Sequence, residues 1–409
     1  MKAIKLIYND IKIDTIKRFL KPSYIYIPIK ENYKVLVKKD SYIYKGQPVI
    51  EDSEGFKTHS SVSGLLKGRC DYKDSSNNTV RCLVIENDYK ELYENKISVT
   101  RDISKYTKEQ FINIIKEAGI VGLGGAGYQT YKKYILENQQ YLVVNAVECE
   151  PLIKTDKGLI KDKIEEILEC IDAITEIMDL KKSIIVVKTN NEDIIEIINQ
   201  YKGTYLNIDL EIVDNKYPNG WERKIVHDVL KLKYKNYPSE VGVIVNNVST
   251  IYAMYEALKY KKPLIEKIVT ITGNNIVNPN NCLVKIGTSL NEIIPSLGGL
   301  IEEGNYLISG SVMTGKVLTT LDTTIEKHNN CFLCQKDKKN KLTSCIKCGK
   351  CSDICPVGLS PVLIRQNLDN PKMLEKLGAN RCISCGLCSY VCVAKIEIKE
   401  NVQTARKRV

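Results

Sequence analysis

Two runs of cysteines near the end of the chain constrain this sequence more than any other feature. Both follow the spacing C-x2-C-x2-C-x3-C, one from Cys345 and the other from Cys382. That run is typical of [4Fe–4S] clusters, and in two-cluster ferredoxins the fourth cysteine of each run ligates the other cluster. Structural zinc also binds C-x2-C pairs, but zinc sites rarely need such extended runs twice. We therefore predict two cluster ligand sets: Cys345, Cys348, Cys351 and Cys392 for the first, and Cys382, Cys385, Cys388 and Cys355 for the second.

The rest of the composition is typical of a cytoplasmic globular protein with several domains. The 409 residues include 15 cysteines. No apolar run approaches the ~20 residues of a spanning helix, and the N-terminus lacks the pattern of a signal peptide. Cysteines in such a protein usually serve metal or redox chemistry rather than disulfides. The net charge of +11 is spread over the chain without a basic block, so no nucleic-acid partner is expected.

Hydrophobic periodicity divides the chain into four regions. Residues 1–100 contain short alternating strands with glycine turns, which predict a small β-barrel or sandwich. Residues 101–262 alternate helical patterns with apolar strands and are typical of an α/β domain. A helix is predicted from Thr107, another over 131–138, and a buried strand over 141–145. Residues 263–325 return to short strands. Residues 326–409 hold the two cysteine runs and one preceding C-x-x-C pair.

A glycine loop in the α/β region is the first candidate binding site. It contains Gly122, Gly124, Gly125 and Gly127, and a predicted helix precedes it. A Rossmann fingerprint needs a strand there. Two alternatives remain from these residues alone: a loop whose N–H groups bind a phosphate at a helix start, or a plain helix–loop–helix. Two polar segments favour binding, because each follows a predicted strand and ligands in α/β domains lie at strand carboxyl ends. They contain Asn145, Glu148 and Glu150, and Asn246, Asn247 and Thr250.

The pair Cys331-Phe-Leu-Cys334 lies just before the cysteine runs. A C-x-x-C pair serves as a redox dithiol, as half of a zinc site, or as two unrelated thiols. No second half-site is free for zinc. A redox-active dithiol and two inert thiols therefore both remain open.

The glycine loop, the two polar segments and the order of the regions resemble the flavin- and NADH-binding subunit of respiratory complex I. They resemble the RnfC subunit of Rnf complexes still more closely. Residues 45–64 resemble the barrel-sandwich domain of RnfC proteins, residues 268–300 resemble their SLBB (soluble ligand-binding β-grasp) domain, and the cysteine runs resemble their two-cluster ferredoxin-like α domain. The resemblance implies FMN cradled by the four glycines and held by Lys133, Asn145, Asn246, Asn247 and Thr250, with Glu148 and Glu150 near the nicotinamide and the flavin ring.

The resemblance also implies an electron-transfer flavo-iron–sulfur protein that passes electrons from NADH through FMN and two clusters to an acceptor protein. The pair Cys331/Cys334 resembles proline-reductase-associated electron-transfer proteins, so D-proline reductase, reached through that dithiol, is the first acceptor expected. One alternative is the RnfC component of a membrane Rnf ferredoxin:NAD oxidoreductase, attached peripherally and not inserted. Another is a flavin-free iron–sulfur scaffold, which Val147 and Ser249 favour because complex I subunits have Asp and Glu there.

Overall fold

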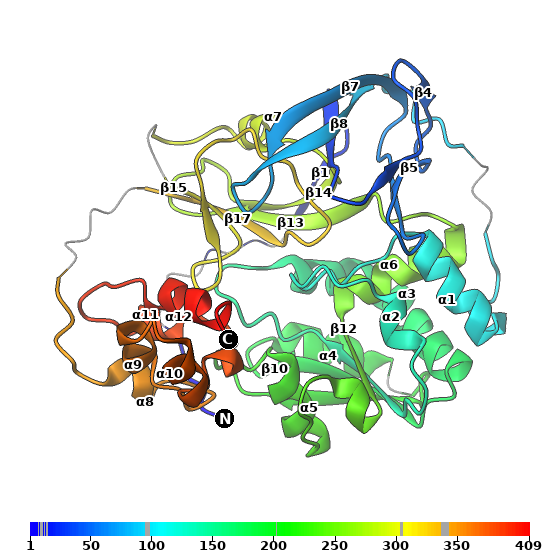
Figure 1. Ribbon diagram of the computed structural model, residues 1–409. Coiled ribbons are helices and arrows are strands. Elements are labelled where there is room, and N and C mark those ends of the chain that lie inside the picture. The colour runs from blue at the N-terminus through cyan, green and yellow to red at the C-terminus, as the bar shows by residue number, and fades with distance from the viewer. Residues whose placement is uncertain are drawn as a thin grey trace.

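The structure is a computed structural model of the chain that describes residues 1–6, 8, 11, 13, 15–94, 99–201, 203–302, 306–336 and 343–409. Figure 1 shows two β regions (blue and yellow) above an α/β domain (green), with a small helical domain (orange and red) beside the α/β domain. The barrel-sandwich, α/β and ferredoxin-like parts of the predicted fold are thus all present.

The N-terminal β-domain consists of two small antiparallel sheets. Alternate residues such as Ile25, Ile27, Leu83 and Ile85 point into its core, as the period of two predicts. The first sheet has the order β2 (Tyr24–Pro28), β8 (Thr79–Asn87), β7 (Gly64–Lys73) and β4 (Tyr42–Ile43), and the second has the order β3 (Lys34–Val35), β5 (Pro48–Glu51) and β6 (Lys57–His59).

The α/β domain is built on four parallel strands in the order β11 (Ile208–Val213), β10 (Lys182–Lys188), β9 (Tyr141–Asn145) and β12 (Val243–Asn247). Both faces of the sheet are covered, as expected for nearly continuous apolar strands. One face packs on α1 (Lys108–Glu117), α3 (Thr155–Ile177), α4 (Glu192–Gln200) and α6 (Val248–Tyr260), and the other on α5 (Glu222–Leu230). The strand order reverses between β9 and β12, which is where ligands bind in open α/β sheets.

Of two helices predicted in this domain, one begins where the sequence indicates and the other is shorter than expected. α1 begins after Thr107, whose hydroxyl and the Gln110 side chain form a capping box. α2 (Tyr131–Tyr134) is shorter than the predicted helix 131–138. It ends at the cap residue Ile135, and Asn138, at the end of the predicted range, has a left-handed backbone that a helix does not contain. Two 3-10 helices complete the domain, η1 (Ile103–Lys105) and η2 (Pro238–Val241).

A six-stranded mixed sheet, with α7 (Leu290–Ser296) on one face, forms the second β-domain. Its order is β1 (Ile16–Phe19), β14 (Asn280–Lys285), β13 (Glu266–Thr272), β17 (Cys331–Gln335), β15 (Tyr306–Ser309) and β16 (Lys316–Leu318). Two predicted boundaries are wrong here. β1 belongs to this sheet and not to the N-terminal domain, and β17 belongs to it and not to the cysteine region, because both pair in parallel with strands distant in sequence. The SLBB assignment of this region stays a prediction.

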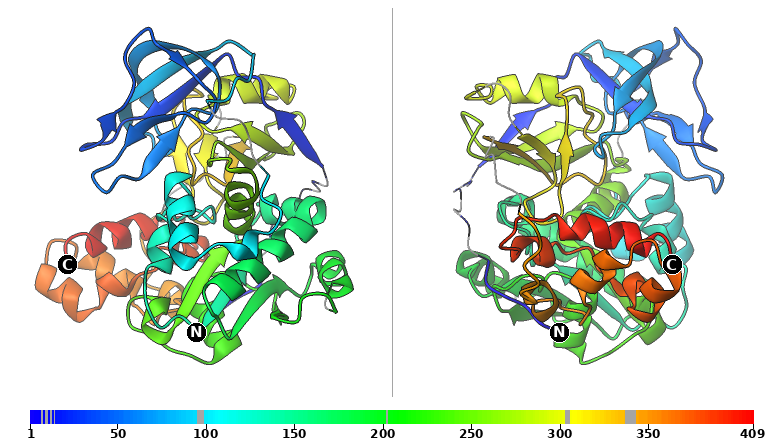
Figure 2. Two further views of the ribbon diagram at one scale, coloured as in Figure 1. Left: turned by 90° about the vertical axis from the view of Figure 1, so that its right-hand side faces the viewer. Right: turned by 60° about the vertical axis from the view of Figure 1, so that its left-hand side comes forward.

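The cluster domain, residues 343–409, has short helices around one apolar core that includes Ile364 and Val402. They are α8 (Lys350–Asp353), α9 (Pro361–Gln366), α10 (Pro371–Lys376), η3 (Ala379–Arg381), α11 (Leu387–Tyr390) and α12 (Ile398–Arg406). Figure 2 shows this domain beside the α/β domain, with the N-terminal segment next to it. Among the described residues, no helix combines the length and apolar character needed to cross a membrane.

Candidate functional site

The carboxyl ends of β9 and β12 form a crevice with the glycine loop. Asn145 and Asn247 lie opposite each other in the strand register. The Leu123 N–H donates to the Thr250 hydroxyl over 2.9 Å, which ties the loop to the start of α6. A Cβ on Gly124 would lie 3.1 Å from the Cβ of Asn247. The loop is therefore pressed against the strand ends where a side chain would not fit without movement.

Other predicted flavin residues reach the crevice to different degrees. The Lys133 ammonium donates to the Val245 carbonyl over 2.5 Å and lies 3.7 Å from Glu222, and burial lowers the pKa of this lysine. The Asn145 amide donates to the Gly220 carbonyl over 3.0 Å. Asn246, by contrast, points away and donates to the Tyr134 hydroxyl.

The two predicted carboxylates have structural partners. Glu148 accepts hydrogen bonds from the Thr155 hydroxyl and the Asp156 N–H, and so satisfies the first turn of α3. One oxygen of the half-buried Glu150 accepts from the Thr314 hydroxyl, and desolvation raises the pKa of this carboxyl. Both carboxylates therefore fix the segment 148–156 in place at the edge of the crevice.

Asp156 is a site residue that the sequence did not reveal. It is buried and accepts from the Asn247 amide over 2.6 Å and from the Ser249 hydroxyl over 2.8 Å. Burial, and next the charge of Glu148, raise the pKa of Asp156 to about 7. It follows the polar segment without any motif of its own, so only its neighbours in space identify it.

The residues around the crevice fit a bound flavin nucleotide. The loop closes through the Gly122 and Gly127 N–H groups, while Gly124 and Gly125 at its tip stay exposed for a phosphate. Among the described residues near the crevice, the Glu150 and Asn219 side chains each have a buried oxygen without a hydrogen-bond partner. Such orphaned groups are rare in folded proteins and point to a missing ligand or water.

The second predicted cluster set encloses a cavity. Its four cysteines, Cys355, Cys382, Cys385 and Cys388, line one small cavity in the cluster domain. The Ser384 N–H donates to the Cys382 sulfur over 3.3 Å, an interaction common around cluster thiolates. Burial raises the pKa of the Cys385 thiol to about 11, so a bound metal has to displace this proton. The four thiols fit a [4Fe–4S] cluster.

The first cluster set is more open. Cys351 and Cys392 pack in the core of the domain, Cys345 is half-buried and Cys348 is exposed. The two cysteine runs nevertheless repeat the same backbone. Left-handed conformations occur at three matched pairs of positions, Lys347 and Ser384, Gly349 and Gly386, and Gly358 and Lys395. α8 and α11 also begin at matched positions. This internal repeat supports two similar sites.

The crevice and the second cluster set are connected through Tyr217. Its hydroxyl donates to the Cys385 carbonyl over 2.6 Å, and its ring is buried with Met313 and Leu387. Cys149, in the polar segment after β9, packs in the same cluster. The Cys149 sulfur lies 2.7 Å from the position of a Cβ on Gly220, whose carbonyl binds Asn145. Only a few side chains therefore separate the two sites.

Cys331 and Cys334 do not form the dithiol considered above. Both are buried in β17, where successive side chains alternate between the two faces, so residues three apart point in opposite directions. At about 3.3 Å per residue their Cα atoms are about 10 Å apart, beyond the ~7 Å limit for a disulfide. Burial raises the pKa of both thiols and so disfavours the reactive thiolate form. Two inert thiols remain as the interpretation.

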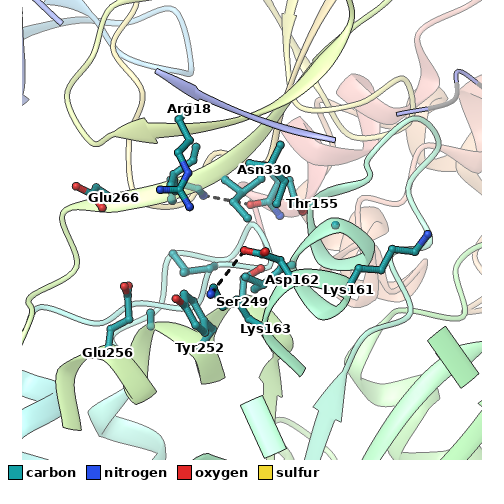
Figure 3. Close-up of a pocket in the computed structure, with 18 of the residues that line it drawn as sticks. Arg18, Thr155, Lys161, Asp162, Lys163, Ser249, Tyr252, Glu256, Glu266 and Asn330 are labelled. Carbon is teal, nitrogen blue, oxygen red and sulfur yellow. Dashed lines mark hydrogen bonds and ion pairs between the residues drawn. The ribbon is translucent and has the colours of Figure 1, made fainter. Parts of the chain in front are cut away.

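A cavity away from the strand ends is a separate feature. It measures about 550 Å³ and lies between α3, α6 and the strands β1, β13 and β14 (Figure 3). Its wall reaches the glycine loop only at Leu123, and none of the predicted flavin residues lines it. Several of its charges are paired, since Lys262 lies 2.8 Å from both Glu256 and Glu266. We interpret it as a solvated crevice between two domains.

Three domain families match the chain in the order expected. An RnfC barrel sandwich hybrid domain matches residues 9–90, a Nuo51 FMN-binding domain matches residues 115–256, and a 4Fe-4S dicluster domain matches residues 344–396. The second match contains the glycine loop and both polar segments. The third contains all eight predicted cluster cysteines.

Curated relatives match most of the chain. The C subunit of an ion-translocating oxidoreductase complex from Buchnera aphidicola subsp. Acyrthosiphon pisum is 32% identical over 83% of this chain and 74% of the relative. The C subunit of a proton-translocating ferredoxin:NAD(+) oxidoreductase complex from Clostridium ljungdahlii is 29% identical over 84% and 78%. The C subunit of an ion-translocating oxidoreductase complex from Pasteurella multocida is 29% identical over 83%, but the match spans only 42% of its length.

A solved structure shares the fold. The NAD+-reducing [NiFe]-hydrogenase in the H2-reduced state superimposes with a TM-score of 0.54 at 14% identity, covering 76% of this chain and 64% of that one. At this identity the likeness concerns the fold alone.

Proposed function

Because the chain belongs to the RnfC family, represented by the C subunits of ion-translocating oxidoreductase complexes, we propose that it exchanges electrons between NADH and a one-electron carrier within such an assembly. It is an electron-transfer flavo-iron–sulfur protein of the RnfC type. The comparisons give no support to D-proline reductase as the acceptor. Their names favour the Rnf-type alternative instead.

FMN and two [4Fe–4S] clusters are the cofactors that the matched domains bind. Bound FMN supplies the conversion of a two-electron hydride transfer into single electrons, which each cluster carries one at a time. The chain's own contribution is to hold these groups and to exclude water from between them.

In this proposal the glycine loop takes the flavin phosphate, and Lys133 provides positive charge at the base of the crevice. Asn145, Asn247 and Thr250 orient the flavin from the strand ends. Glu148 and Asp156 act as positioning residues, because their hydrogen bonds hold the start of α3 and the Asn247 side chain. Asn246 has an indirect role through Tyr134.

The single observation that supports this function best is the connection through Tyr217. Its buried ring and its hydrogen bond to Cys385 support a path in which the second cluster set, and not the first, lies next to the crevice. A buried, water-excluded contact between two cofactor sites is what an internal electron path needs.

The proposal is tested by anaerobic reconstitution with iron, sulfide and FMN, followed by rapid mixing with NADH. We expect loss of flavin absorbance first and of the broad iron–sulfur absorbance next. Trp221, the single tryptophan, follows Gly220 at the start of α5, so its fluorescence reports FMN binding independently. Bound FMN that NADH does not reduce would rule out NADH as the donor. Absent FMN binding would favour the flavin-free scaffold.

A further inference from the structure

We propose that the surface around Cys348 is the docking face for an acidic one-electron carrier protein. This inference rests on the proposed function, because it assigns the outer end of the same electron path. The two halves of the cluster domain repeat the same backbone, and a comparison between them supports this inference. The inner half surrounds the second cluster set, and the outer half surrounds the first.

The inner half already shows how this domain docks on a redox module. The face formed by Cys385, Gly386 and Leu387 is covered by the rest of the chain. Tyr217 donates to the Cys385 carbonyl, and the Met313 carbonyl lies where a side chain on Gly386 would be. Leu387 is almost completely buried against Tyr217 and Met313. This face lies next to the second cluster set and points toward the crevice.

The outer half carries the equivalent face without a cover. Cys348, Gly349 and Lys350 match Cys385, Gly386 and Leu387 in the repeated backbone. Among the described residues, which include all fifteen cysteines, Cys348 is the only exposed cysteine. The neighbouring Ile346 is 66% exposed, an unusual position for a large apolar side chain. The face that the rest of the chain covers at the second cluster set is therefore open to another protein at the first cluster set.

Charge distinguishes the two faces and identifies the partner's chemistry. Lys347, Lys350 and Lys395 surround the first set and are exposed. The matched positions around the second set are Ser384, Leu387 and Gly358, none of which is charged. One acid, Asp353, shares the outer face, and the Lys2 ammonium donates to its carbonyl and adds a further positive charge. A basic face with an apolar centre fits a partner with a complementary acidic face.

The step at this face is the transfer of one electron. The carrier's iron–sulfur centre is oxidised by one electron as the first cluster is reduced by one, or the reverse, and no proton or bond changes. The direction is set by the two reduction potentials and not by the docking face.

The test is a binding measurement with both proteins oxidised, so that no turnover is needed. The reconstituted holoprotein is titrated by calorimetry at low ionic strength with an acidic plant-type [2Fe–2S] ferredoxin. Basic cytochrome c serves as the probe of opposite charge. We expect binding of the ferredoxin that weakens with salt, and at least tenfold weaker binding by Lys347→Glu/Lys350→Glu, within the range of electrostatic effects on association.

The control is Lys372→Glu/Lys376→Glu. It makes the same charge change at exposed positions of α10, which packs on η3 and α12. It should bind the ferredoxin within about twofold of the wild type. Lys347→Gln/Lys350→Gln, with an intermediate loss expected, covers the case in which the charge reversal disturbs cluster assembly. Iron content is measured for every variant.

The outcomes separate this inference from the proposed function. Equal weakening by the two double variants, no binding of ferredoxin at low salt, or tighter binding of cytochrome c would each overturn the docking face. If NADH still reduces the clusters in those cases, the proposed function stands. Selective loss of ferredoxin binding in a protein that NADH does not reduce would support the face and refute the donor.

Discussion

The Tyr217 hydroxyl donates a 2.6 Å hydrogen bond to the main-chain carbonyl of Cys385. Tyr217 belongs to the loop that precedes α5, whose Gly220 carbonyl binds Asn145 in the crevice. Cys385 is a predicted ligand of the second cluster. One side chain thus joins the two candidate cofactor sites, although they lie in different domains and the bonded partners are 168 positions apart in the chain.

Substitution of Tyr217 should affect the path between the sites more than either site alone. Tyr217→Phe removes only the hydrogen bond and is expected to cost about 1 kcal/mol of stability. Tyr217→Ala also removes the buried ring and should slow reduction of the clusters at least tenfold while FMN binding persists. Stopped-flow absorbance at the cluster band measures this. Tyr237→Phe, at an exposed tyrosine of the same domain, is the matched control. Unchanged cluster reduction in Tyr217→Ala would show that electrons take another route.

Loss of one ligand from each cluster should have unequal consequences. In Cys385→Ser, NADH is expected to reduce FMN while neither cluster bleaches, because the inner cluster is missing. In Cys348→Ser the inner cluster should still bleach. Each variant should retain roughly half of the iron, and Cys355→Ser should behave like Cys385→Ser because the fourth cysteines cross over. If Cys355→Ser resembles Cys348→Ser instead, the ligand sets are wrong.

Gly124→Ala tests the close contact in the crevice. Its Cβ would approach Asn247 to 3.1 Å, closer than ordinary van der Waals contact, so the loop has to shift. We expect about tenfold weaker FMN binding, equivalent to about 1.4 kcal/mol. Titration of Trp221 fluorescence measures it. Gly203→Ala, where no atom lies within 4 Å of the new Cβ, should bind FMN normally. Equal affinity in the two variants would remove the glycine loop from the site.

His59 should make stability depend on pH. Burial, and next the charges of Lys327 and Lys57, lower the pKa of His59 to about 3, whereas the unfolded chain has the ordinary value of about 6.5. Below pH 6.5 His59 is therefore protonated in the unfolded state but stays neutral in the folded state. The free energy of unfolding falls as the pH drops. Between pH 7.5 and 5.5 this loss is about 1.4 kcal/mol.

Urea unfolding of the holoprotein at the two pH values measures the effect. His59→Gln should lose most of this slope, because no buried imidazole remains. His227→Gln, at a half-exposed position on α5, should keep it. Identical slopes in the wild type and His59→Gln would assign the pH dependence to other groups.

Much of the architecture is visible in the sequence because it depends on local patterns. The strand 141–145 and the helix start at Thr107 follow from apolar periodicity and a cap, and the structure has both. The cysteine spacing predicts the cavity lined by Cys355, Cys382, Cys385 and Cys388, although three of these come from one run and one from the other. The exchange of the fourth cysteine between the two sets is predictable only because this spacing is specific to two-cluster ferredoxins.

The sequence by itself determined which residue types can bind the cofactors, because the glycine loop and the cysteine runs are defined by residue identity and spacing along the chain. The tertiary structure decided which of them meet. β17 completes a sheet with β13 and so directs Cys331 and Cys334 to opposite faces, and Asp156 reaches Asn247 through the fold alone. The same packing buries Leu387 and leaves its counterpart Lys350 in solvent. Such contacts join residues that are far apart in the chain, and no local periodicity, cap or spacing records them.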